Sequence, residues 1–229
     1  MKTVLIHGQN HKGSTYQIAR QVADKIGGES QEFFLPKDFD QFCIGCCNCF
    51  GRDESLCPHY EKLKPITAAM DAAEVLIFSS PVYVMHASGP MKSFLDHFGY
   101  RFMVHRPEEK MFKKQAVCVA TAAGAGMKST IKDIDSSLFF WGIPKRHRLG
   151  FAVRAVEWQA VDGKMKSKID EKTTRLAQKI KAANGNVKPG LKTRVMFYFV
   201  RRMQQNGFNE ADRLYWEKKG WTAKKRPWQ

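Results

Sequence analysis

The chain has 229 residues, which predicts one α/β domain of about 150 to 190 residues followed by an extension. Its composition, with 43% apolar, 12% aromatic and 26% charged residues, excludes a disordered chain, a collagen-like fibre and a small disulfide-stabilised protein. The net charge of +16 is concentrated: residues 1–140 carry 16 basic and 15 acidic side chains, whereas residues 141–229 carry 22 and 7. A basic region of this kind either binds an anion (a nucleotide phosphate, an acidic partner, nucleic acid or a membrane surface) or is a solvated surface.

The longest apolar run, residues 195–200, is far shorter than the roughly 20 residues that span a bilayer. The apolar run over residues 3–6 is too short for the core of a signal peptide. Five of the six cysteines lie within fifteen residues, which indicates metal or redox chemistry in place of a disulfide framework. We therefore expect a soluble, cytoplasmic protein.

Apolar runs and their spacing predict an alternation of strands and helices. In chain order these are a strand at 2–7, a helix at 14–26, a strand at 31–35, a loop at 37–60, a helix at 61–71, a strand at 74–79, a helix at 89–103, a strand at 115–120, a helix at 127–141, a strand at 147–156 and a helix at 170–183. This alternation indicates a parallel sheet covered on both faces, within a domain over residues 1–185. Residues 186–229 form a basic, aromatic-rich extension.

The first loop of interest, residues 8–15, follows the first strand and opens a helix. Its backbone N–H groups, Lys12 and the hydroxyls of Ser14 and Thr15 are placed to bind a phosphate at that helix N-terminus. The loop contains neither a P-loop nor a G-x-G-x-x-G dinucleotide motif. The alternative is that Ser14 only caps the helix.

Two further loops leave the carboxyl ends of predicted strands, where open α/β sheets bind ligands. Residues 79–87 contain a rigid Pro81 and a flat side chain at Tyr83, but Ser-Pro is a common turn. Residues 121–126 are almost without side chains, which allows a flat ligand to approach the backbone, or makes a plain connection.

Together, the three loops resemble those of flavodoxin-like NAD(P)H-dependent FMN reductases, over about residues 1–183. The similarity lies in residues 13–19 and in Ser80-Pro81-Val82-Tyr83 followed by residues 88–96. The resemblance implies a doubly wound sheet of five parallel strands in the order 2-1-3-4-5, bound FMN, and NAD(P)H as co-substrate. It also implies that the FMN site comprises Gln9, His11, Lys12, Ser14 and Thr15 at the phosphate, and Pro81, Val82, Tyr83, Val84, Thr121, Ala122, Gly124 and Gly126 around the ring. Gln9 and His11 replace the Ser and Arg of many relatives.

The cysteines at Cys43, Cys46, Cys49 and Cys57 form a C-x2-C-x2-C-x7-C pattern. This pattern resembles that of the iron–sulfur flavoproteins, which implies a [4Fe–4S] cluster near the flavin. Two alternatives remain. One is a zinc site made of four thiolates, or of three thiolates and His59; the other is a set of reduced thiols without metal.

The function implied by the resemblance is an oxidoreductase that takes a hydride from NAD(P)H onto FMN and passes electrons to a quinone, nitro compound, flavin or other small acceptor. A rival is an electron carrier that uses FMN and the cluster to serve a protein partner. A nucleic-acid-binding module rests on charge alone, because the chain contains no recognised motif. No side chain stands out as catalytic, since FMN would carry the chemistry.

The resemblance also implies a homodimer or larger homo-oligomer. Residues 194–202 of the extension are apolar on nearly every side of a helix, so this segment must be buried. Because the sheet already has its own helices, we expect packing across a subunit interface, with its basic residues near the neighbour's flavin. Packing on its own domain and contact with a membrane surface are the alternatives.

Overall fold

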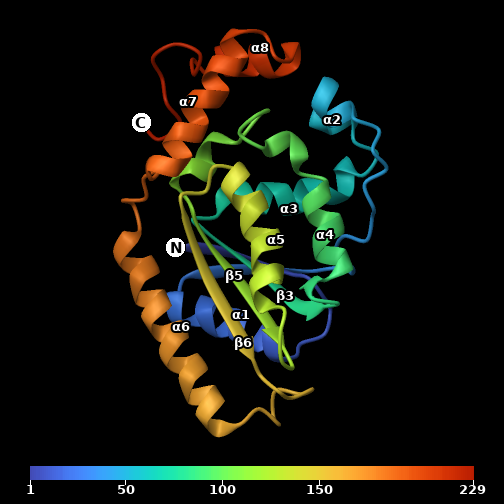
Figure 1. The fold of residues 1–229 in the computed structure, drawn as a ribbon, viewed down its shortest axis with the longest axis vertical. Helices are drawn as coiled ribbons and strands as arrows, with labels where there is room; N and C mark the ends of the chain where they lie inside the picture. Colours follow the sequence, from blue (N-terminus) through green and yellow to red (C-terminus); the bar gives the residue numbers. More distant parts are fainter.

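Five parallel strands form the centre of the protein in the computed structural model, which describes residues 1–229 (Figure 1). They lie in the order β2-β1-β3-β5-β6, which is the predicted order 2-1-3-4-5 once a two-residue strand, β4, is set aside. The strands are β1 (Lys2–His7), β2 (Glu29–Phe34), β3 (Val75–Tyr83), β4 (His86–Ala87), β5 (Gln115–Ala122) and β6 (Lys145–Ala152). The prediction of a flavodoxin-like α/β sheet is confirmed.

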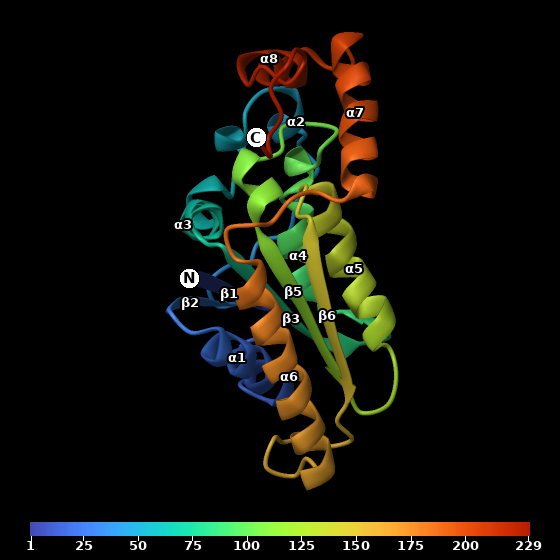
Figure 2. The ribbon, with the colours of Figure 1, turned by 90° about the vertical axis from the view of Figure 1, so that its left-hand side faces the viewer.

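Helices cover both faces of this sheet (Figure 2). They are α1 (Ser14–Ile26), α2 (Asn48–Gly51), α3 (Tyr60–Ala72), α4 (Gly89–Asp96), α5 (Met127–Phe140) and α6 (Gly163–Ala183), with short 3-10 turns at Glu54–Leu56, Gly99–Arg101 and Glu109–Lys113. On one face α3, α4 and α5 pack over alternate strand residues such as Ile6 and Phe78. On the other face α1 and α6 pack over Leu5 and Ile77. Burial on both faces explains why the strands are continuous apolar runs.

Several boundaries differ from the predicted ones. Strand β3 continues through Pro81, which pairs with Thr121, so the second loop is a tight hairpin into β4. Helix α4 ends at Asp96, seven residues before the predicted end. Helix α6 begins seven residues earlier than predicted, because the Asp162 carboxylate accepts a hydrogen bond from the Met165 N–H and caps the helix at 3.1 Å.

The extension forms two helices, α7 (Leu191–Gln205) and α8 (Glu210–Lys218), which lie together at one end of the molecule (Figures 1 and 2). Phe197, Val200, Trp216 and Trp221 are fully buried there, against residues of the same chain such as Phe112. The expectation of packing across a subunit interface was therefore wrong for these side chains. The extension packs on the end of the domain and not on a face of the sheet. Helices that cover both faces therefore leave room for it. No helix is both long and apolar enough to cross a membrane.

Candidate functional site

A cavity of about 310 Å³ lies at the carboxyl ends of the strands, where the three predicted loops meet. Hydrogen bonds join these loops directly. The Thr15 and Thr121 hydroxyls bond to one another, and the Tyr83 hydroxyl donates to the Gln9 amide oxygen. The first, second and third loops thus form one continuous wall.

Nine of the thirteen predicted residues line this cavity: Gln9, His11, Ser14, Thr15, Pro81, Val82, Tyr83, Thr121 and Ala122. Four do not. The Lys12 ammonium lies 5.4 Å from the centre of the Tyr16 ring, and Val84 is 95% exposed in the β3–β4 turn. Gly124 is at an open position, and Gly126 lies behind Val82 as the N-cap of α5.

The structure adds residues at the ends of β1 and β6 to the cavity wall, namely His7, Val153, Ala155 and Val156, together with Tyr16 from the first turn of α1. The rule that ligands lie at the carboxyl ends of strands could have identified them. His7 was the last residue of the first predicted strand, and residues 153–156 closed the fifth.

Ser14 is the first residue of α1, and its hydroxyl has no partner. Gly13 is the N-cap, no side chain caps the helix, and the first turn carries no acidic residue. The Ser14 Oγ is buried without a hydrogen bond. The alternative that Ser14 only caps α1 is therefore wrong. A buried free hydroxyl beside the unbonded N–H groups of a helix N-terminus fits a phosphate group.

Gly8 allows the first loop to pass close to the second. A Cβ at Gly8 would lie 2.7 Å from the Ser88 Oγ, which donates a 2.6 Å hydrogen bond to the Gly8 carbonyl. At the other edge, Gly126 has a φ of +93°, and a Cβ there would lie 2.4 Å from a Val82 methyl group. Glycine is required at both positions because the backbones approach so closely. Val82, Ala122, Val153 and Val156 then give the cavity an apolar side that suits a flat ring.

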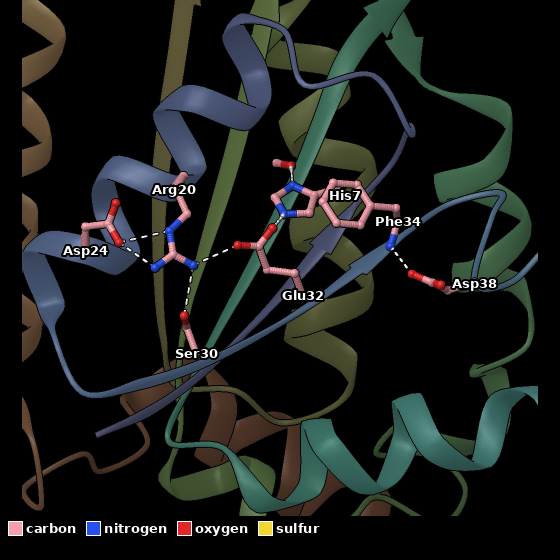
Figure 3. A network of polar contacts seen from close by, with 8 residues as sticks. His7, Arg20, Asp24, Ser30, Glu32, Phe34 and Asp38 are labelled. Carbon is pink, nitrogen blue, oxygen red and sulfur yellow. Dashed lines mark hydrogen bonds and ion pairs between the residues drawn. The ribbon is translucent and has the colours of Figure 1, made fainter.

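His7 lies at the floor of the cavity in a polar network (Figure 3). Its Nδ1 lies 2.8 Å from the Ser79 hydroxyl, and its Nε2 lies 3.4 Å from a Glu32 oxygen. Arg20 donates a 2.7 Å hydrogen bond to Glu32 and holds that carboxylate in place. Burial lowers the pKa of His7 to about 4, although Glu32 acts in the opposite direction. The ring is therefore neutral near pH 7.

The four patterned thiols lie apart from the cavity wall and differ in exposure. Cys43 and Cys46 are exposed, whereas Cys49 and Cys57 are half-buried against the core. Burial raises the pKa of Cys49 to about 11, and nearby Cys57, Cys43 and Cys46 act in the same direction, because a second thiolate would repel the first. The four sulfurs do not form a group of ligand atoms within 4.8 Å of one another; of the four, only Cys57 belongs to such a group. Cys47, the fifth, donates to the Gly45 carbonyl.

Comparison with known proteins gives a family and a fold. The family model described as NADPH-dependent FMN reductase matches residues 1–156. An iron-sulfur flavoprotein of Archaeoglobus fulgidus is 25% identical over 181 residues, which cover 75% of this chain and 78% of that protein.

Two solved structures share the fold. An azoreductase from Bacillus anthracis aligns with a TM-score of 0.59 at 12% identity and covers 78% of this chain and 99% of its own. A flavone reductase aligns with a TM-score of 0.58 at 15% identity, over 83% of this chain but only 66% of that chain, slightly under two thirds of its length.

Proposed function

The chain belongs to the NADPH-dependent FMN reductase family, and from this premise we propose that the cavity at the strand ends is its FMN site. The protein is an FMN-dependent oxidoreductase that uses NAD(P)H and a small electron acceptor. The observation that carries the placement is the buried, unpartnered Ser14 hydroxyl at the N-terminus of α1.

Within this site, Ser14, Thr15 and the first-turn N–H groups of α1 hold the phosphate, with Gln9 and His11 beside it. Pro81, Val82, Tyr83, Thr121 and Ala122 line the ring. Bound FMN supplies the redox chemistry, by accepting a hydride from NAD(P)H and giving electrons to the acceptor. The protein's own contribution is to orient the two partners and to keep water away with its valine side chains. Lys12, Val84, Gly124 and Gly126 shape the rim outside the wall.

The direct test is anaerobic reduction of the FMN-loaded protein. Addition of NADH or NADPH should bleach the flavin spectrum, and a quinone, a nitro compound or free flavin should restore it. Comparison of the two nucleotides and the three acceptors identifies the preferred pair. A protein that does not take up FMN, or whose bound FMN is not reduced, would overturn the proposal.

We also propose that the working form is a homodimer in which one copy covers the other's cavity mouth. Four apolar side chains beside the cavity support this: Val84 and Val156 are more than 90% exposed, and Tyr83 and Met85 about half exposed. Such a patch beside a ligand site is typical of an interface. Val84→Lys should lower the mass measured by light scattering to that of one chain, and an unchanged mass would contradict the dimer.

The six unpaired cysteines suit the reducing cytoplasm, where we place the enzyme.

A second candidate is an electron carrier with a [4Fe–4S] cluster on Cys43, Cys46, Cys49 and Cys57. It is supported by the C-x2-C-x2-C-x7-C spacing of the four thiols and by the iron–sulfur relative. It predicts about four irons and four sulfides per chain in protein purified without oxygen. Cys57→Ser should abolish both.

A further inference from the structure

Three metal-binding side chains meet at a second place in the molecule, outside the FMN cavity. They are Cys57, His59 and His97, and their ligand atoms all lie within 4.8 Å of one another. Cys57 follows the 3-10 turn at Glu54–Leu56, His59 is the N-cap of α3, and His97 is the C-cap of α4. The site thus joins elements that are forty residues apart in the sequence.

Backbone contact fixes which nitrogen of His97 is free. Its Nδ1 lies 2.8 Å from the Ser93 carbonyl oxygen, which can only accept a hydrogen bond, so Nδ1 carries the proton. The lone pair is then on Nε2, which points at His59 Nδ1 at 2.9 Å. A histidine held by a backbone carbonyl on one nitrogen, with the other nitrogen free, is the usual arrangement of a metal ligand.

The surroundings hold this ring in place. His97 is only 4% exposed, and the Phe39 ring packs edge-on against it with 4.8 Å between centres. His59 and Cys57 are half-buried beside it.

We propose that Cys57, His59 and His97 bind a zinc ion, with a water molecule in the fourth position. Thiolate sulfur and imidazole nitrogen are the ligands that zinc prefers, with metal–ligand distances of about 2.0 to 2.3 Å. Ligand atoms around such an ion are about 3.3 to 3.8 Å apart. The two histidine nitrogens, now 2.9 Å apart, need to separate slightly, and the Cys57 sulfur, within 4.8 Å of both, needs to move no more than about an ångström inward. Binding releases the thiol proton of Cys57, and the ring proton of His59 moves from Nδ1 to Nε2.

This site and a four-thiol cluster exclude one another, because both use Cys57. They differ in the other ligands: zinc needs His59 and His97, whereas the cluster needs Cys43, Cys46 and Cys49. The exposed pair Cys43 and Cys46 therefore supplies control substitutions for the two histidines.

The test uses the full chain loaded with FMN, stripped of metal with a chelator and then titrated with Zn²⁺. We expect one zinc per chain, and Co²⁺ in its place should show the absorption bands of a tetrahedral thiolate site. His59→Ala and His97→Asn should weaken zinc binding by more than about 100-fold, beyond the loss of an outer partner. Cys43→Ser and Cys46→Ser should leave it unchanged.

Bound FMN reports folding in each variant, and the half-buried His59 provides a site where substitution leaves the core intact. Zinc binding that survives both histidine substitutions would overturn the proposal. So would loss of zinc in Cys46→Ser, or iron and sulfide in place of zinc when both are supplied. None of these outcomes bears on whether the cavity binds FMN.

Discussion

Ser14 is the residue that ties the FMN proposal to a single atom. Its buried Oγ has no hydrogen-bond partner in the protein, so a phosphate oxygen would supply one by accepting a hydrogen bond from it. One hydrogen bond to a charged group contributes about 1.5 to 3 kcal/mol, so Ser14→Ala should weaken FMN binding about 10- to 100-fold. Flavin fluorescence measures this affinity directly.

Riboflavin, which lacks the phosphate, is the matched ligand for this variant. Its affinity should hardly change in Ser14→Ala. Ser136→Ala, on an exposed part of α5 where the hydroxyl only bonds to the Lys132 carbonyl, should alter neither affinity. Equal losses for the two flavins would place the Ser14 hydroxyl away from the phosphate.

His7 predicts a pH dependence of stability. Its pKa falls from 6.5 to about 4 on folding, so the unfolded chain binds more protons between these values and stability is lost as pH falls through them. The contribution lost between pH 7 and pH 5 is about 2 kcal/mol. His7→Asn keeps a hydrogen-bond partner for Ser79. Urea unfolding of this variant should therefore lose about 2 kcal/mol less free energy between pH 7 and pH 5 than unfolding of the unmodified chain. If the unfolding free energy of the variant fell as much between pH 7 and pH 5 as that of the unmodified chain, His7 would not be the cause. The loss would then come from His97 and His147, whose pKa values burial also lowers.

Sequence patterns located the site residues on the loops but not their side-chain directions. Ser14 and Tyr83 were found because small and flat residues follow buried strands. Lys12 was expected at the phosphate, yet its ammonium lies 5.5 Å from the centre of the Phe34 ring, a residue on β2. That contact depends on how β2 pairs with β1, which no local pattern records. Val84 points outward because its φ of +47° reverses the chain in a two-residue turn.

At the scale of elements, two neighbouring phenylalanines of α7 differ in burial, because only one of them packs into the aromatic cluster at the end of the domain. Phe197 is fully buried and stacks on Trp216 with 4.8 Å between ring centres, whereas Phe199 is 63% exposed. Phe197→Ala should cost about 3 to 5 kcal/mol of unfolding free energy, and Phe199→Ala less than about 0.5 kcal/mol. Chemical denaturation of the two variants tests whether the extension is part of the folded core. Similar small losses in both would mean that α7 is only loosely attached.

The longer strands and helices over residues 1–185 could be predicted because they have a regular spacing of apolar residues. The short α2 and β4, which lie within predicted loops, could not. The packing of the extension could not be predicted either, since its partners are Phe139 at the end of α5 and residues 103–112, which have no regular spacing of apolar residues. Arg106 shows the kind of contact involved. It donates a 2.6 Å hydrogen bond to the fully buried Asp212 of α8, and also bonds to the Cys49 and Phe50 carbonyls. The extension therefore holds the cysteine segment, a link that no sequence spacing revealed.

At the scale of the whole molecule, the extension and the cavity lie at opposite ends of the sheet. The cavity is at the carboxyl ends of the strands, while α7 and α8 lie beyond their amino ends, as Figure 2 shows. The charge of the chain is concentrated in residues 141–229. Only charges close to the cavity should act on NAD(P)H, because salt screens exposed charges beyond about 8 Å at physiological ionic strength.

We therefore expect that neutralising the far end leaves the Michaelis constant for NAD(P)H unchanged. Arg202, Lys218 and Lys224 are exposed on the extension and make no ion pair, so their joint replacement by Gln removes charge alone. Arg154 is the matched control, because it is exposed between Val153 and Ala155 of the cavity wall. At about 6 Å in water one charge contributes about 0.7 kcal/mol, so Arg154→Gln should raise the constant about threefold. If the triple variant raised it as much, the extension of a second copy would have to reach the cavity, and a dimer built through the Val84 patch alone would be wrong.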